Sequence, residues 1–157
     1  MNILGNGLLF NNVSAAPPPS GNQYIYISGG DTNGIFYFMG LNNGVWTNPH
    51  TLGTINVTAS SVLFPQNFGE VNTIVDRQPG NFHTGNWDPF PWVEIDLKTK
   101  KLKMSTWTYR FRYDSGFHLP STIRVSGTNN GVDYTIIDEQ NLNPRTPNTW
   151  LNYNTFS

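Results

Sequence analysis

The residues best suited to bind a ligand lie in one short segment, residues 81–90, with the sequence NFHTGNWDPF. Aromatic rings alternate there with amide, imidazole and carboxylate groups. Sugars suit such a surface, because their C–H faces stack on a ring while their hydroxyls hydrogen-bond to polar groups. The ligand-binding residues that we predict, including two basic residues expected to lie nearby in the fold, are Phe82, His83, Asn86, Trp87, Asp88, Phe90, Arg110 and His118. Two other roles stay open: Trp87 and Phe90 plug the end of the core, or they contact a protein.

A second pair of groups, Glu94 and Asp96, could serve acid–base chemistry. The two residues stand two apart on a predicted strand, so their side chains leave the same face. A structural role is the stronger expectation for them. The sequence has no Gly-x-Ser-x-Gly elbow and no glycine-rich phosphate loop. We therefore expect a protein that is not an enzyme.

Residues that could bind metal lack the usual ligand spacing. The chain has no cysteine, and its three histidines are His50, His83 and His118. No two of them stand at the spacing of a zinc site, so we predict no metal and no cofactor. A structural calcium stays open, because three acidic residues near turns offer oxygen ligands. They are Asp31, Asp76 and Asp88.

Charge is sparse in this chain and unevenly placed. The 157 residues include 9 basic and 10 acidic ones, and Asp31 is the only charged residue before Glu70. The absence of a basic run argues against nucleic acid as a partner. No apolar run approaches the about 20 residues that cross a membrane, so we expect no membrane insertion. The N-terminal residues also lack the positive region of a signal peptide.

Short strands must position these side chains. Alternating or β-branched runs predict strands at residues 24–28, 35–39, 54–60, 92–97, 106–113, 121–126 and 133–138. The clearest run places Trp107 and Tyr109 on one face and Thr108 and Arg110 on the other. Turn sequences occur at residues 31–34, 42–44 and 129–131. No window has a helical apolar period, so the chain reads as all-β.

The first 22 residues are expected to form an N-terminal arm. Leu8, Leu9 and Phe10 are a small apolar group, followed by a stiff Ala-Ala-Pro-Pro-Pro spacer. This arm is either a partly disordered terminus or a segment whose three apolar residues contact a neighbouring subunit. Residues 23–157 are expected to form a single domain.

Several motifs occur in order in the second half of the chain. They are IVD at residues 74–76, the loop residue Trp87, WVEIDL at 92–97, YRFR at 109–112, PSTIRVSG at 120–127 and NNGVDY at 129–134. In this order they resemble the discoidin family, also called the coagulation-factor C-type or galactose-binding-like domain. The resemblance covers roughly residues 71–138.

The resemblance implies a discoidin-like jelly-roll β-sandwich, usually non-catalytic, whose loops at one end bind sugars, lipids or proteins. Residues 23–70 would then be added strands and residues 71–157 the discoidin-like part. Some members of the family carry a structural calcium. Lys98, Asn130 and Tyr134 stand where the family has Gly, Asp and Trp. The closing strands are expected to come either from residues 24–60 or from another chain.

Two functions follow as expectations. The first is a structural protein of the virion surface, such as a head decoration, fibre or tail protein of a phage-like virus, which forms homo-oligomers or binds other virion subunits. Uncharged Asn, Thr and Gly surfaces lose their hydration at low cost, which suits permanent contacts. The alternative is a galactose-type carbohydrate-binding module that mediates adhesion to cell-surface glycans. Such a module would lie at the cell surface or outside the cell, exported by a non-classical route.

Overall fold

The computed structural model describes residues 7–11, 23–63, 69–77, 82–110, 120–142 and 150–154. The strands in these ranges are β1 (Gly7–Asn11), β2 (Leu41–Asn42), β3 (Val45–Trp46), β4 (Asn56–Ala59), β5 (Trp92–Asp96), β6 (Thr106–Arg110), β7 (Thr122–Thr128), β8 (Thr135–Asn141) and β9 (Trp150–Asn154). The helices are α1 (Ile35–Gly40) and the short 3-10 helix η1 (Val71–Val75). The protein is mostly strands with almost no helix, which confirms the all-β prediction.

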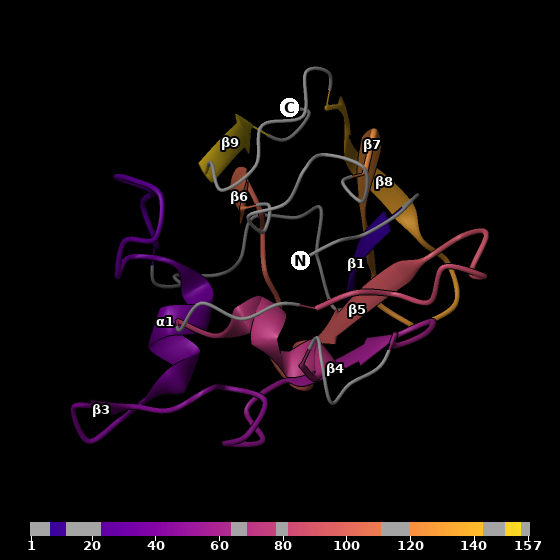
Figure 1. Cartoon of the computed structure of the whole chain (residues 1–157). Coiled ribbons are helices and arrows are strands. Elements are labelled where there is room, and N and C mark those ends of the chain that lie inside the picture. Colours follow the sequence, from indigo (N-terminus) through magenta and orange to yellow (C-terminus); the bar gives the residue numbers. More distant parts are fainter. Residues whose placement is uncertain are drawn as a thin grey trace.

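Two sheets form the body of the molecule (Figure 1). The larger has five strands in the order β4-β5-β1-β7-β8, and the smaller pairs β6 with β9. β1 runs parallel to both of its neighbours, whereas β4 and β8 pair antiparallel at the two edges. β4, β5, β7 and β8 lie where strands were predicted.

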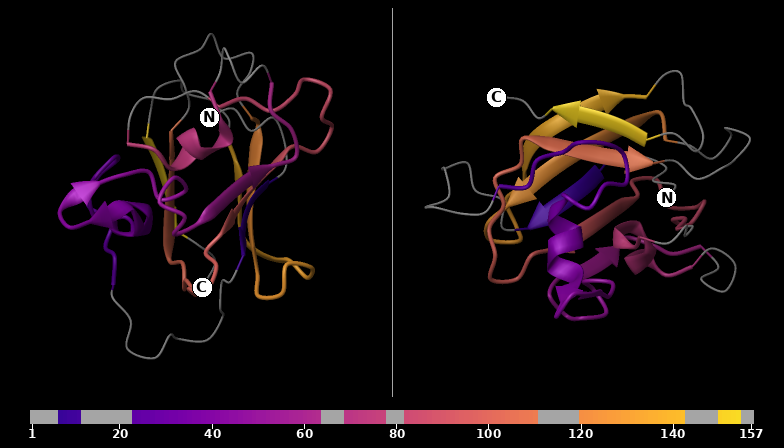
Figure 2. Two further views of the ribbon diagram at one scale, coloured as in Figure 1. Left: turned by 90° about the horizontal axis from the view of Figure 1, so that it is seen from below. Right: turned by 90° about the vertical axis from the view of Figure 1, so that its left-hand side faces the viewer.

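The hydrophobic core lies between these two sheets, which face each other in Figure 2. Its inner residues include Val93 and Ile95 of β5 and Trp107 and Tyr109 of β6. Each pair is separated by one less buried residue, as the period of a strand requires. The alternation predicted for residues 92–97 and 106–110 is therefore confirmed; residues 111–113 lie outside the described ranges.

Two predicted strands near the N-terminus are wrong. Residues 35–39 form the helix α1, in which the N–H groups of Tyr37 and Phe38 donate to the carbonyl of Gly34. The helix ends at Gly40, where a Cβ atom would lie 2.5 Å from the carbonyl oxygen of Thr47. Residues 24–28 form no strand, and Ser28 lies in a bend. In both segments, contacts with other parts of the chain outweigh the local preference for a strand.

The predicted turns have different outcomes. Residues 42–44 join β2 to β3 with φ angles of +50° at Asn43 and +80° at Gly44, the signs of a type I′ hairpin turn. Residues 129–131 likewise lie in the connection between β7 and β8. Residues 31–34 make no hairpin, because the Asp31 carboxylate binds the N–H groups of Ile27, Ser28 and Asn33 and closes a loop that leads into α1.

The segment predicted to be an N-terminal arm contains the central strand of the larger sheet. β1 lies between β5 and β7, with Leu8 paired to Val93 on one side and to Val125 on the other. The backbone of Leu8, Leu9 and Phe10 is thus inside this sheet and does not project from it. The rest of the predicted arm, residues 1–6 and 12–22, lies outside the described ranges.

Candidate functional site

The predicted ligand segment is a loop that is fixed to the end of β4. Asp88 accepts hydrogen bonds from the hydroxyls of Ser60 and Ser61 through Oδ2, with an oxygen–oxygen distance of 2.6 Å to Ser61. The Ser61 hydroxyl also accepts the N–H of Gly85 at 2.9 Å, and the N–H of Phe90 donates to Asp88 Oδ1 at 3.2 Å. These bonds fix both sides of the loop tip, so the Asp88 carboxylate organises the loop.

The same bonds shift the acidity of Asp88. Partial burial acts to raise the pKa of this carboxyl, but the hydrogen bonds from Ser60, Ser61 and Phe90 outweigh it. The pKa therefore lies below the ordinary aspartate value of 3.8. These hydrogen bonds therefore stabilise the ionised form of the Asp88 side chain.

This shift predicts how acid affects the loop. A carboxyl whose pKa is depressed in the folded state adds stability above its unfolded-state pKa and loses it as pH falls through the folded pKa. We expect wild type to melt above Asp88→Asn at neutral pH, with a difference that shrinks below pH 3.8. Thermal unfolding midpoints of both proteins between about pH 7 and pH 2 measure this. A difference that stays constant over that range would contradict the role of the carboxylate.

The aromatic residues of the loop divide into a buried and an exposed set. Phe82 is fully buried in the core and His83 is also buried, whereas Trp87 is 75% exposed and Phe90 is 67% exposed. The interpretation of Trp87 and Phe90 as core plugs is therefore wrong, because both side chains are mostly exposed, and the core residue of this segment is Phe82. The indole of Trp87 lies against Gly85, where a Cβ atom would come within 2.7 Å of its ring. Trp87 and Phe90, with exposed Asn86, remain at the surface as contact residues.

The two basic residues predicted to complete this site are Arg110 and His118. Arg110 is exposed at the end of β6, in the smaller sheet, and His118 lies outside the described ranges. The prediction that they join the site thus stays a prediction.

The carboxylate pair of β5 has structural partners. Glu94 accepts a hydrogen bond of 2.9 Å from the hydroxyl of Tyr134, the residue that directly precedes β8. Burial, and then the hydrogen bond and charge of Glu94, raise the pKa of Tyr134 to about 12. Asp96 accepts the N–H of Lys98 at 2.7 Å. These contacts agree with the structural role expected for Glu94 and Asp96.

The candidate metal ligands are separate in the part of the chain that the structure describes. No group of three or more His, Cys, Asp or Glu side chains gathers there in a way that could hold a metal ion. His50 accepts the N–H of Val57 through Nδ1, at the free edge of β4. The carboxylates of Asp31 and Asp88 are bonded to N–H and hydroxyl donors. The side chains considered for calcium thus stabilise loops.

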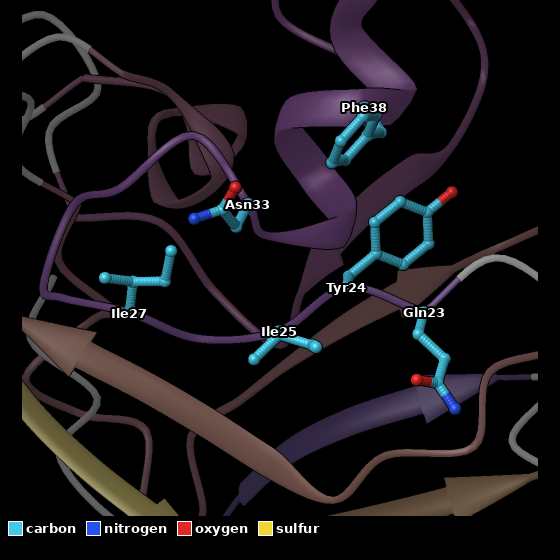
Figure 3. Close-up of a pocket in the computed structure, with 6 residues that line it drawn as sticks. All are labelled: Gln23, Tyr24, Ile25, Ile27, Asn33 and Phe38. Carbon is cyan, nitrogen blue, oxygen red and sulfur yellow. The ribbon is translucent and has the colours of Figure 1, made fainter.

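A hollow that the sequence analysis missed lies beside α1 (Figure 3). It has a volume of about 230 Å³ and is lined by Gln23, Tyr24, Ile25, Ile27, Asn33 and Phe38. The rings of Tyr24 and Phe38 meet with their centroids 4.6 Å apart, which joins the extended segment 23–28 to the helix. The only signal in the sequence was the alternating apolar run at residues 24–28, which we interpreted as a strand within the domain.

Comparisons with protein-family models, with curated proteins and with solved structures find no match to this chain. The fold places the protein in the all-β class, with a five-stranded and a two-stranded sheet around one core. Within the described ranges, no helix has the length and apolar character that a membrane crossing requires.

Proposed function

We propose that this chain is a non-catalytic subunit of a larger protein assembly, of the kind that forms the virion surface of a phage-like virus as a head decoration, fibre or tail protein. The observation that carries this proposal is an exposed apolar surface in the nearly uncharged N-terminal part of the chain. Ile25 and Ile27 are exposed there and Phe38 is partly so, and all three line one hollow. Exposed apolar side chains that gather on one surface mark sites of protein contact.

The scarcity of charge supports the same proposal. Between Gln23 and Leu63 the only charged residue is Asp31, and its carboxylate is bonded to three backbone N–H groups. A surface without free charges loses little hydration energy when another protein covers it. Core regions of stable interfaces are depleted of charged residues in the same way.

The fold that we propose for this subunit is a discoidin-like jelly roll. The two facing sheets with a shared core are compatible with it, as are the strands found at the resembling motifs. In this proposal the closing strands of the family are replaced by N-terminal residues, since β1 and β4 come from outside residues 71–138.

The experiment that tests the assembly proposal is a measurement of native mass by light scattering over a range of concentrations. We expect a stable oligomer, or attachment to a larger particle when the chain is produced with its neighbouring proteins. A monodisperse monomer that binds no such particle would contradict the proposal. Loss of the oligomer in high salt would also contradict it, because an uncharged interface does not depend on ion pairs.

The second candidate function, a galactose-type carbohydrate-binding module, is favoured by the loop that carries Trp87. Its indole is exposed and held on a bonded loop, which is what stacking against a sugar ring requires. We expect galactosides to bind in calorimetry and Trp87→Ala to abolish that binding. Val132→Ala removes an equally exposed apolar side chain elsewhere and serves as the control. Binding that survives Trp87→Ala would exclude this loop as the site.

A further inference from the structure

Three asparagine–glycine pairs lie outside the helices and strands of the described ranges. They are Asn33–Gly34, Asn43–Gly44 and Asn130–Gly131. Because glycine has no Cβ atom, its backbone nitrogen can approach the side-chain amide carbon of the asparagine before it and displace ammonia. This attack requires a free asparagine side chain and a free glycine N–H, so the hydrogen bonds of each pair decide how fast it reacts.

The Asn130–Gly131 pair is held by several hydrogen bonds. Oδ1 of Asn130 accepts the N–H groups of Val132 at 3.0 Å and Asp133 at 2.9 Å, and Nδ2 donates to the Asp133 carboxylate at 2.8 Å. The N–H of Gly131 donates to the Thr128 hydroxyl at 3.1 Å. Both the amide and the attacking nitrogen are therefore restrained, although Asn130 and Gly131 are exposed.

The Asn33–Gly34 pair is restrained by the loop that leads into α1. The N–H of Asn33 donates to Oδ1 of Asp31 at 2.9 Å, and the Asn33 side chain also hydrogen-bonds to that carboxylate. The side-chain bond must break before the amide carbon of Asn33 can turn toward the nitrogen of Gly34. This pair is thus protected in the same way as Asn130–Gly131.

The Asn43–Gly44 pair is open. Both residues are exposed, and a Cβ atom placed on Gly44 would have no other atom within 4 Å. Among the residues that the structure describes, none hydrogen-bonds to the side chain of Asn43 or to the N–H of Gly44. Both reacting groups are therefore free in this pair.

The hairpin around Asn43–Gly44 is also small. β2 and β3, which flank the turn, have two residues each and form a sheet of their own. Figure 1 shows β3 at the periphery of the molecule, away from the two larger sheets. Because a two-stranded hairpin is only marginally stable, local opening costs little and lets the Asn43 side chain turn toward the Gly44 nitrogen.

We propose that Asn43–Gly44 is a site of spontaneous hydrolytic modification, at which water converts the asparagine to isoaspartate or aspartate. The nitrogen of Gly44 forms a bond to Cγ of Asn43 and loses its proton, the Cγ–Nδ2 bond breaks, and ammonia leaves with that proton. The resulting succinimide ring takes up one water molecule, which opens the ring at either carbonyl carbon and leaves a carboxylate. This inference does not rest on the proposed assembly function.

The modification changes the charge and the backbone of this surface. It adds a negative charge to the segment from Gln23 to Leu63, in which Asp31 is the only charged residue. Isoaspartate also lengthens the main chain by one CH₂ group within a two-residue turn. The added group strains the pairing of Asn42 with Val45, the residues on either side of that turn.

Peptide mapping by mass spectrometry tests the proposal on the full chain, incubated folded in a mildly alkaline buffer. We expect Asn43 to convert about tenfold or more faster than Asn130, because each hydrogen bond that must break before the attack slows the reaction. An isoaspartate-specific methyltransferase should label the peptide that contains Asn43, since isoaspartate forms only through the ring.

The same chain in guanidinium chloride is the reference, because the hydrogen bonds are lost there and the two pairs should convert at similar rates. Thr128→Val is the matched variant. It removes the acceptor of the Gly131 N–H and should speed the conversion of Asn130 while that of Asn43 stays unchanged, with folding checked by circular dichroism. Equal rates at Asn43 and Asn130 in the folded wild type would overturn the proposal. So would an Asn43 that stays intact in the folded chain but converts in the denaturant.

Discussion

Phe82→Ala is expected to lower the free energy of unfolding by about 3–5 kcal/mol. The side chain is fully buried in the core, so its removal leaves a cavity that the surrounding residues fill only in part. Trp87→Ala, in the same loop, removes a larger ring but is expected to cost less than about 1 kcal/mol, because that ring is mostly in water. Urea denaturation of the two variants measures the difference.

Comparing the stability of these two variants distinguishes a structural role from a ligand-binding role for each ring of the loop. If Trp87→Ala were as costly as Phe82→Ala, the indole would belong to the core and could not be a stacking surface for a ligand. The expected result instead leaves Trp87 free to act in binding. Because both variants change the same loop, a difference between them reports the position of each ring and not the general sensitivity of the segment.

Asp138→Leu is the second substitution with a large expected effect. Asp138 is fully buried, and its Oδ2 accepts the indole N–H of Trp107 at 2.7 Å and the side-chain N–H of Gln140 at 3.1 Å. Leucine fills the space but leaves the buried Trp107 donor without an acceptor, which costs about 1–3 kcal/mol. We expect a loss of stability in that range, measured by urea denaturation.

A double-mutant cycle assigns this loss to the hydrogen bond. Trp107→Phe removes the donor, so in the Asp138→Leu background it should cost about 0.5–3 kcal/mol less than it costs in wild type. Equal costs in both backgrounds would contradict the assignment. The Trp107 ring also lies 4.8 Å from the ring of Tyr153 on β9. Burial, and then the charge of Asp138, raise the pKa of Tyr153, so this carboxylate influences both strands of the smaller sheet.

The parts of the fold that the sequence predicts correctly are the strands in which apolar and polar residues alternate along the chain. In β5 and β6 each side chain alternates between the core and the other face, so the period of the residues reports the strand directly. Residues 35–39 carry similar β-forming residues but form α1. Tyr24 packs on Phe38, and the Arg77 guanidinium lies over Tyr37. Neither neighbour is close in sequence, and no local pattern contains them.

Within the candidate site, the exposure of part of the loop was predictable, but the contacts that hold the loop were not. The composition of residues 81–90 indicates a recognition loop, and Trp87 and Phe90 do lie at the surface. The loop is held by bonds from Ser60 and Ser61 to Asp88, and these serines, which directly follow β4, lie 28 and 27 residues away in the sequence. The hollow beside α1 could not be predicted for the same reason, because Tyr24 and Phe38, which line it, meet only in the fold.

The central position of β1 has a consequence for how the protein is made. Its neighbours are β5 and β7, whose last paired residues are Asp96 and Thr128. Translation adds about 5–20 residues per second, so β1 waits roughly 4 to 17 seconds until Asp96 completes β5, and longer until Thr128 completes β7. Before Asp96 has been added, the apolar sequence GLLFN has neither of its two native neighbours. During that interval chaperones and neighbouring chains compete for this strand.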